Sequence, residues 1–218
     1  MSIAKVAICI PSFETWRART AVCHSELCVY STLKDIAVKT SCYHSSIISM
    51  SRNRLVRIAL AFDPVCTHIL WIDSDMSFVP DALERLLAHD KDIVGAFYNQ
   101  RMPPYGTVGH LLEPCDISKG GLHRADLMPH GLVLVKRSVY ERLPAPWYSE
   151  GYDPALIKEE DPDGVIGEDA GFSRKAIAAG IEMWCDASLT FETGHIGEIV
   201  VPCRPPKGID QTSVTEVG

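Results

Sequence analysis

Two carboxylates, Asp73 and Asp75, directly follow an apolar run, His68-Ile-Leu-Trp-Ile72. In extended backbone, side chains two residues apart point to the same side, so both carboxylates can face one hard cation such as Mn2+ or Mg2+. Such a cation neutralises the charge that develops on a diphosphate leaving group. Because apolar residues also follow the pair, up to Pro80, a merely solvated turn explains it poorly. The sequence therefore predicts a metal and diphosphate site at Asp73-Ser74-Asp75.

Alternating strands and helices are expected around this pair. Strands are predicted at 5–10, 36–43, 68–72 and 93–97, and helices at 20–33, 51–62 and 80–89. Ser51 is the predicted N-cap of its helix, which would place Arg52 and Asn53 in the first turn. This order at short spacing is typical of βαβ units and a parallel sheet, in which ligands bind at the carboxyl ends of the strands.

The second half of the chain is less regular. Helical and strand periodicity fail at 99–130 and 144–167, and segments this long without structure are usually functional. Strands are predicted at 131–136 and 181–185, and helices at 138–143 and 169–179. Trp147 and Tyr148 are aromatic residues that could stack on a sugar. Arg101, which follows the predicted strand at 93–97, is a candidate for contact with a diphosphate or an acceptor.

The composition is that of a globular enzyme, with 46% apolar and 22% charged residues among 218. No apolar run approaches the roughly 18–20 residues of a membrane span. Eight cysteines without a CxxC pair argue against a zinc ribbon. The apolar start has no small-residue cleavage site, which favours a reducing, cytoplasmic location. A net charge of −7 provides no long-range attraction to nucleic acid.

The order of these motifs resembles that of GT-A glycosyltransferases, in particular family-2-like members, including those of viruses and phages. The matching segments, which extend from about residue 5 to 197, are 7–11, 51–53, 68–76, 130–137, 167–172, 179–186 and 193–197. The resemblance implies one α/β domain whose mostly parallel central sheet is flanked by helices and joined by a smaller acceptor-side β portion. Residues of about 1–100 would bind the nucleotide sugar, about 101–197 would form the acceptor half, and 198–218 would be a tail.

The resemblance also implies the activity, which is transfer of a sugar from a UDP- or GDP-sugar to an acceptor hydroxyl, with inversion as the expected stereochemistry. Asp73, Asp75 and His195 would hold the metal. The imidazole among these ligands favours manganese over magnesium. Asp169 is the candidate base and Glu168 the second choice. The residues expected to bind the donor are Pro11, Arg52, Asn53, Asp73, Ser74, Asp75 and Arg101.

Several alternatives stay open from the sequence. A nucleotidyltransferase usually carries a glycine-rich loop after its first strand, and the stretch from Pro11 to Arg17 contains no glycine. A non-catalytic nucleotide- or carbohydrate-binding module would leave the acidic residues and His195 without a purpose. Asp169 could also act only as a helix cap. The acceptor could be a glycan, a lipid-linked sugar, a protein or a modified base in phage DNA.

Overall fold

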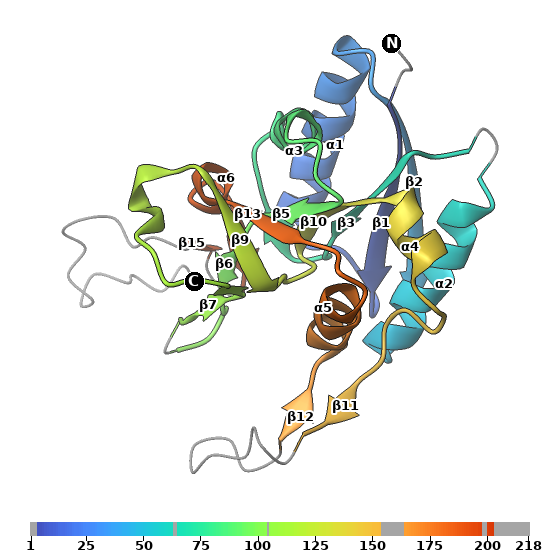
Figure 1. Cartoon of the computed structure of the whole chain (residues 1–218). Helices are drawn as coiled ribbons and strands as arrows, with labels where there is room; N and C mark the ends of the chain where they lie inside the picture. Colours follow the sequence, from blue (N-terminus) through green and yellow to red (C-terminus); the bar gives the residue numbers. More distant parts are fainter. Residues whose placement is uncertain (1–3, 63–64, 104, 154–163, 198–199, 203–218) are drawn as a thin grey trace.

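The computed structural model describes residues 4–62, 65–103, 105–153, 164–197 and 200–202. An eight-stranded mixed sheet forms the centre, and helices cover both of its faces (Figure 1). In spatial order the strands are β2 (Ala37–His44), β1 (Lys5–Ser12), β3 (His68–Ile72), β10 (Leu132–Lys136), β5 (Ile93–Gly95), β13 (Met183–Asp186), β9 (Leu122–Leu127) and β8 (His110–Leu111). The α/β class predicted from the sequence is confirmed.

The sequence predicted a mostly parallel sheet, and the directions of the strands make it mixed, with three parallel and four antiparallel pairs. β1 is parallel to β2 and β3, and β5 is parallel to β13. β10 lies between β3 and β5 and is antiparallel to both, and β9 is antiparallel to β13 and β8. The apolar run of β10 did not reveal its direction, because a strand buried on both faces has the same composition in either orientation.

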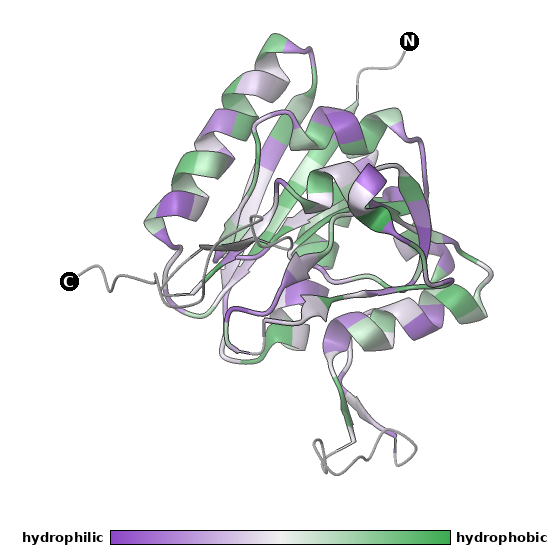
Figure 2. Ribbon diagram, turned by 90° about the vertical axis from the view of Figure 1, so that its left-hand side faces the viewer, coloured by the Kyte–Doolittle hydropathy of each residue, from purple (hydrophilic) through white to green (hydrophobic). Residues whose placement is uncertain are grey.

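The helices pack in two layers. α1 (Ala18–Leu33) and α3 (Ala82–Ala88) share one apolar cluster with one face of the sheet. α2 (Ile48–Leu60), α4 (Arg137–Arg142) and α5 (Glu168–Ala178) share the other. Figure 2 shows the hydrophobic ribbon concentrated in the central strands, while the covering helices alternate hydrophobic and hydrophilic residues. No helix in the described ranges is both long enough and apolar enough to span a membrane.

Short elements complete the fold. They are β4 (Met76–Ser77), β14 (Gly194–Ile196) and β15 (Val200–Pro202) in a three-stranded sheet; the pair β6 (Tyr98–Asn99) and β7 (Thr107–Val108); the pair β11 (Gly151–Tyr152) and β12 (Val165–Ile166); α6 (Ala187–Thr190); and the 3-10 helix η1 (Ile117–Lys119). The tail predicted at 198–218 lies outside the described residues except for β15, as does 154–163 of the second irregular segment.

Three expectations from the sequence are wrong. The segment 99–130 contains β7, β8, η1 and β9 rather than only irregular chain. Its strands escaped prediction because they lie at or near the sheet edge and carry polar residues. Trp147 and Tyr148 are 7% and 1% exposed, so they belong to the core. Tyr148 stacks on Phe172 with ring centroids 4.8 Å apart.

The third correction concerns α2, which begins at Ile48 after an N-cap at Ile47 rather than at Ser51. Ser51 is the fourth residue of α2, and its amide already donates to the carbonyl of Ile47 at 3.1 Å, so it is not the cap. Asn53 consequently lies in the second turn, where its side-chain amide donates to the carbonyls of Ser49 and Tyr148 at 2.8 and 2.7 Å. Its oxygen accepts from the amides of Trp147 and Tyr148, so Asn53 anchors this segment to α2.

Candidate active site

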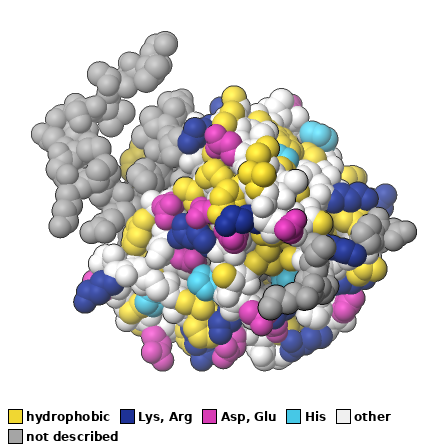
Figure 3. All heavy atoms as spheres, turned by 90° about the horizontal axis from the view of Figure 1, so that it is seen from above, with side chains coloured by type: hydrophobic (Ala, Val, Ile, Leu, Met, Phe, Trp, Pro, Cys, Tyr) yellow, Lys and Arg dark blue, Asp and Glu magenta, His cyan; other side chains and the backbone are white. Residues whose placement is uncertain are grey.

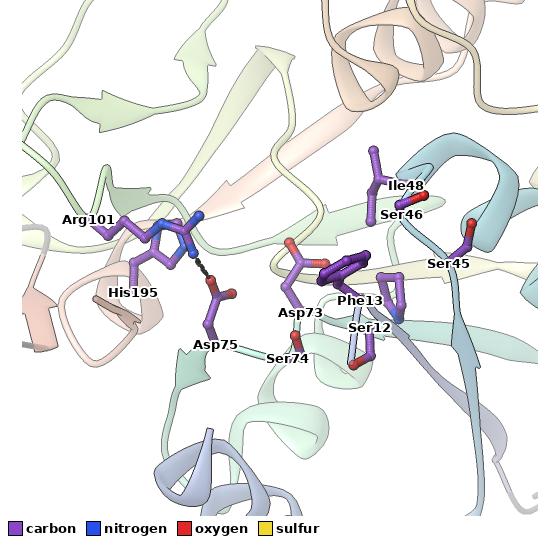
Figure 4. A pocket seen from close by; sticks show the side chains of 11 residues that line it. Ser12, Phe13, Ser45, Ser46, Ile48, Asp73, Ser74, Asp75, Arg101 and His195 are labelled. Atoms are coloured by element: carbon purple, nitrogen blue, oxygen red, sulfur yellow. Dashed lines mark hydrogen bonds and ion pairs between the residues drawn. The ribbon is translucent and has the colours of Figure 1, made fainter. Parts of the chain in front are cut away.

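A cavity of about 590 Å³ opens at the carboxyl ends of β1, β2 and β3 (Figure 4). Its lining consists of Pro11, Ser12, Phe13, Ser45, Ser46, Ile48, Asp73, Ser74, Asp75, Arg101 and His195. The volume lies within the range of roughly 300–1,000 Å³ that is typical of small-molecule sites. The position agrees with the rule that ligands bind where strands of an open α/β sheet end.

Six of these residues were candidates from the sequence: Pro11, Asp73, Ser74, Asp75, Arg101 and His195. Sequence reasoning missed the other five, Ser12, Phe13, Ser45, Ser46 and Ile48. The signal was available for Ser45 and Ser46, because both come shortly after the strand predicted at 36–43. The carboxyl end of that strand lies at the same edge of the sheet as Asp73 and Asp75. Arg52, Asn53, Glu168 and Asp169 do not line the cavity.

The backbone of the Asp73-Ser74-Asp75 tripeptide is fixed from three sides. The amide of Asp73 donates to the carbonyl of Gly131, just before β10, at 3.1 Å. The carbonyl of Ser74 accepts from the amide of Arg17, just before α1, at 2.9 Å. The carbonyl of Asp75 accepts from the amide of Ile196 in β14 at 2.6 Å. Three elements distant in sequence therefore set the direction of the two carboxylates.

Asp75 forms a cluster with a cation and an imidazole. Its Oδ2 lies 2.6 Å from Nη1 of Arg101 and 3.2 Å from Nε2 of His195. Burial alone would raise the pKa of Asp75, but the hydrogen bond and charge of His195 and the charge of Arg101 outweigh it. The pKa of Asp75 therefore lies below its ordinary value, and the carboxylate is ionised.

This cluster fits a divalent cation. Nδ1 of His195 lies 3.2 Å from the carbonyl oxygen of Asn99, which suits a proton on Nδ1, and Nε2 faces Oδ2 of Asp75. Without a metal, a proton on Nε2 makes the hydrogen bond to Asp75, and a cation bound by both atoms would replace that proton. A metal-binding histidine commonly donates its other nitrogen to a carbonyl in this way, and carboxylate with imidazole suits manganese.

Asp73 takes a different partner. Its Oδ1 accepts from Nη2 of Arg52 at 2.9 Å rather than joining Asp75 and His195. Within the described residues, no three His, Cys, Asp or Glu side chains are grouped closely enough to hold a metal ion. The structure therefore brings two of the three expected ligands together, and the three-ligand set stays a prediction.

Arg52 is the buried centre of the site, and only 2% of its surface is exposed. Besides Asp73, it contacts Glu168, with 3.0 Å between Nε and Oε1. Its guanidinium lies over the rings of Trp71 and Tyr148, 5.2 and 5.9 Å from their centroids. Burial alone would lower the pKa of Arg52, but the charges of Asp73 and Glu168 outweigh it and raise the pKa above the ordinary value. Arg52 is thus a permanent cation that positions two carboxylates.

Glu168 and Asp169 form the first turn of α5, next to each other but with different partners. Glu168 is held by Arg52, whereas Oδ1 of Asp169 accepts from the amide of Ala170 at 2.7 Å. Burial and then the charge of Glu168 raise the pKa of Asp169, although Arg52 opposes them. Gly167 is the N-cap residue, so the interpretation of Asp169 as the cap is not supported.

Comparisons with known proteins bear on the fold. Neither a protein-family model nor a curated protein matches this chain. A197 from STIV is similar in structure, with a TM-score of 0.62 and 15% identity over 92% of each chain. At 15% identity this similarity concerns the fold alone, so the chemistry must be argued from the residues of the site.

Two further solved structures are similar over less of their length. The catalytic domain of Drosophila beta1,4-galactosyltransferase 7, in complex with xylobiose, has a TM-score of 0.45 and 16% identity, covering 83% of this chain and 64% of that one. A glycosyltransferase involved in glycosylation of the major capsid of PBCV-1 has a TM-score of 0.38 and 13% identity, covering 65% of this chain and 69% of that one.

The carboxylate of Asp73 gives the site a testable pH dependence. Burial raises its pKa from 3.8 to about 6, with Arg52 opposing the shift and Asp75 and Glu168 adding to it. Between these values the folded protein binds more protons than the unfolded chain, so the free energy of unfolding falls as the pH rises. We expect a decrease on the order of 2 kcal/mol across this range in urea unfolding with a chelator present.

Asp73→Asn should remove this part of the pH dependence, because the amide does not titrate. Asp126→Asn is the matched control, since Asp126 is an exposed carboxylate on β9. An Asp73→Asn protein whose stability falls as steeply as that of the unmodified protein would contradict the assignment.

Proposed function

We propose that the protein is a metal-dependent glycosyltransferase that moves a sugar from a nucleoside-diphosphate sugar to an acceptor hydroxyl with inversion. The observation that carries the proposal is a single cavity in which Asp75, His195 and Arg101 face the ends of β1 and β2. Charged groups at one end and an aromatic ring at the other match a ligand with an anionic diphosphate and a flat base.

The two ends of the cavity would receive different parts of the donor. Phe13, which is 64% exposed, and Ile48 offer apolar surface for the base, and Ser45 and Ser46 add hydroxyl groups. Figure 4 shows Arg101 and His195 on one side of the two carboxylates and Phe13 and Ile48 on the other. A guanidinium pairs well with phosphate oxygens, which makes Arg101 the candidate for the diphosphate.

Asp75 and His195 are the residues that would hold the cation, and Asp73 is close in sequence and shares the cavity. The bound cation would neutralise the charge of the leaving diphosphate. Arg101 is half exposed, so its guanidinium has room to leave Asp75 and turn to the phosphates. Asp75 would then exchange one cationic partner for another.

The acceptor needs a base, and the structure separates the two candidates by their partners. Arg52 engages Glu168, which leaves Asp169 as the carboxylate available for a proton. The pKa of Asp169 is raised and so lies nearer to neutral pH than that of an ordinary aspartate. A general base works best when its pKa is near the pH at which the enzyme operates. Asp169 would accept the hydroxyl proton as that oxygen bonds to the anomeric carbon, and the diphosphate would leave with the electrons of the broken bond.

Thermal unfolding with a panel of nucleoside diphosphates, each with and without Mn2+, tests donor binding. At 100 times its dissociation constant, the correct diphosphate should raise the melting temperature by roughly 5–10 °C, and only with the metal. Asp75→Asn should lose this increase, while the exposed control Asp126→Asn should keep it. Absence of any metal-dependent shift, or a full shift in Asp75→Asn, would refute the assignment.

Transfer kinetics test the role of Asp169. Asp169→Asn should lower kcat by at least about 100-fold and leave the thermal shift with the diphosphate intact, because the amide keeps the shape but cannot accept the proton. The acceptor panel should include glycans, lipid-linked sugars, proteins and hydroxymethylated DNA. A normal transfer rate in Asp169→Asn would contradict the base assignment. A product that keeps the anomeric configuration of the donor would contradict inversion. A binding module would show no transfer and no donor hydrolysis.

A further inference from the structure

A second pair of reactive side chains lies outside the candidate active site, where the loop after β8 meets the start of β9. The thiol of Cys115 is exposed, and its Sγ lies 3.2 Å from Nδ1 of His123. Nε2 of His123 lies 3.0 Å from the carbonyl oxygen of Gly120. β8 and β9 form the edge of the central sheet opposite β2, so this pair is separated from the cavity at β1 to β3 (Figure 1).

The contacts of His123 assign its protons. A carbonyl oxygen only accepts, so Nε2 carries the proton that it donates to Gly120. In the neutral imidazole, Nδ1 then presents a lone pair to the thiol of Cys115. A nucleophile beside a base that a third group orients is the arrangement that activates catalytic and reactive thiols.

Two adjoining cavities give access to this thiol. One, of about 260 Å³, is lined by Leu112, Glu113, Pro114, Cys115, Leu122, His123 and Arg124. The other, of about 330 Å³, shares Pro114 and Cys115 and extends toward β7 and β8. A small organic molecule can therefore reach Cys115 and contact the residues that line these cavities.

The other cysteines lack this combination. Of the seven in the described part of the chain, Cys115 is the exposed one. Cys28 also contacts an imidazole, with 3.5 Å between its Sγ and Nε2 of His24. Burial, however, raises the pKa of Cys28 and lowers the pKa of His24, which keeps both groups neutral. Cys28 is thus an internal control for a cysteine–histidine contact without activation.

We propose that Cys115 is a reactive thiol, activated by His123, at a site for small organic disulfides. The thiolate attacks one sulfur of the disulfide and forms a new S–S bond with it. The original S–S bond breaks, its second sulfur leaves as a thiolate, and the proton of Cys115 stays on His123. The product is a mixed disulfide at Cys115, a modification that does not depend on the proposed glycosyl transfer.

The test uses the full-length, folded protein with an aromatic disulfide, 5,5′-dithiobis(2-nitrobenzoic acid), and with oxidised glutathione. An ordinary thiol, of pKa about 8.5, is only a few per cent thiolate at neutral pH, so we expect one cysteine that reacts about tenfold faster than free cysteine. In the protein without substitutions, peptide mass mapping should place the adduct on Cys115.

The variants separate activation from exposure. Cys115→Ser should lose the fast phase, and His123→Gln should slow it to the rate of free cysteine, with melting temperatures confirming that both variants fold. Cys28→Ser should leave the fast phase unchanged. The proposal is overturned if Cys115 reacts no faster than free cysteine, if His123→Gln reacts at the unmodified rate, or if the adduct maps to another cysteine.

Discussion

The buried guanidinium of Arg52 is the interaction on which the site depends. It joins the end of β3, through Asp73, to the start of α5, through Glu168, and it is carried by α2. Burying a charge is costly unless it is paired, and removing one partner of such a group typically costs about 3–5 kcal/mol. The rings of Trp71 and Tyr148 complete its enclosure. One cation therefore holds the carboxyl end of β3 and the start of α5 at a fixed separation.

The same interaction explains why carboxylates that are close in sequence behave differently. Asp75, with Arg101 and His195 beside it, has a lowered pKa and stays ionised. Asp73 is partly buried between Arg52 and other carboxylates, and its burial raises its pKa to about 6. Glu168 is occupied by Arg52, whereas Asp169, in the same turn, has a raised pKa. The environment therefore gives neighbouring carboxylates different pKa values, which suits the roles proposed for Asp75 and Asp169.

The sequence was sufficient for the α/β class and for the location of the cavity. Continuous apolar runs predicted the buried strands, and the position of Asp73 and Asp75 after one of them indicated the edge of the sheet at which the cavity opens. The role of Arg52 could not be predicted, because its partners lie 21 and 116 residues away and their contact depends on the tertiary fold. Likewise, the polar composition of β9 concealed a strand that its neighbours β13 and β8 stabilise through backbone pairing.

We propose that Asp75 and His195 hold a divalent cation beside a nucleoside diphosphate. The most direct measurement is an anomalous difference map from crystals grown with Mn2+ and the diphosphate that stabilises the protein. The account predicts a manganese peak within coordination distance of Oδ2 of Asp75 and Nε2 of His195, with the diphosphate in contact with Arg101. A bound diphosphate without manganese at these atoms, or manganese held elsewhere, would contradict it.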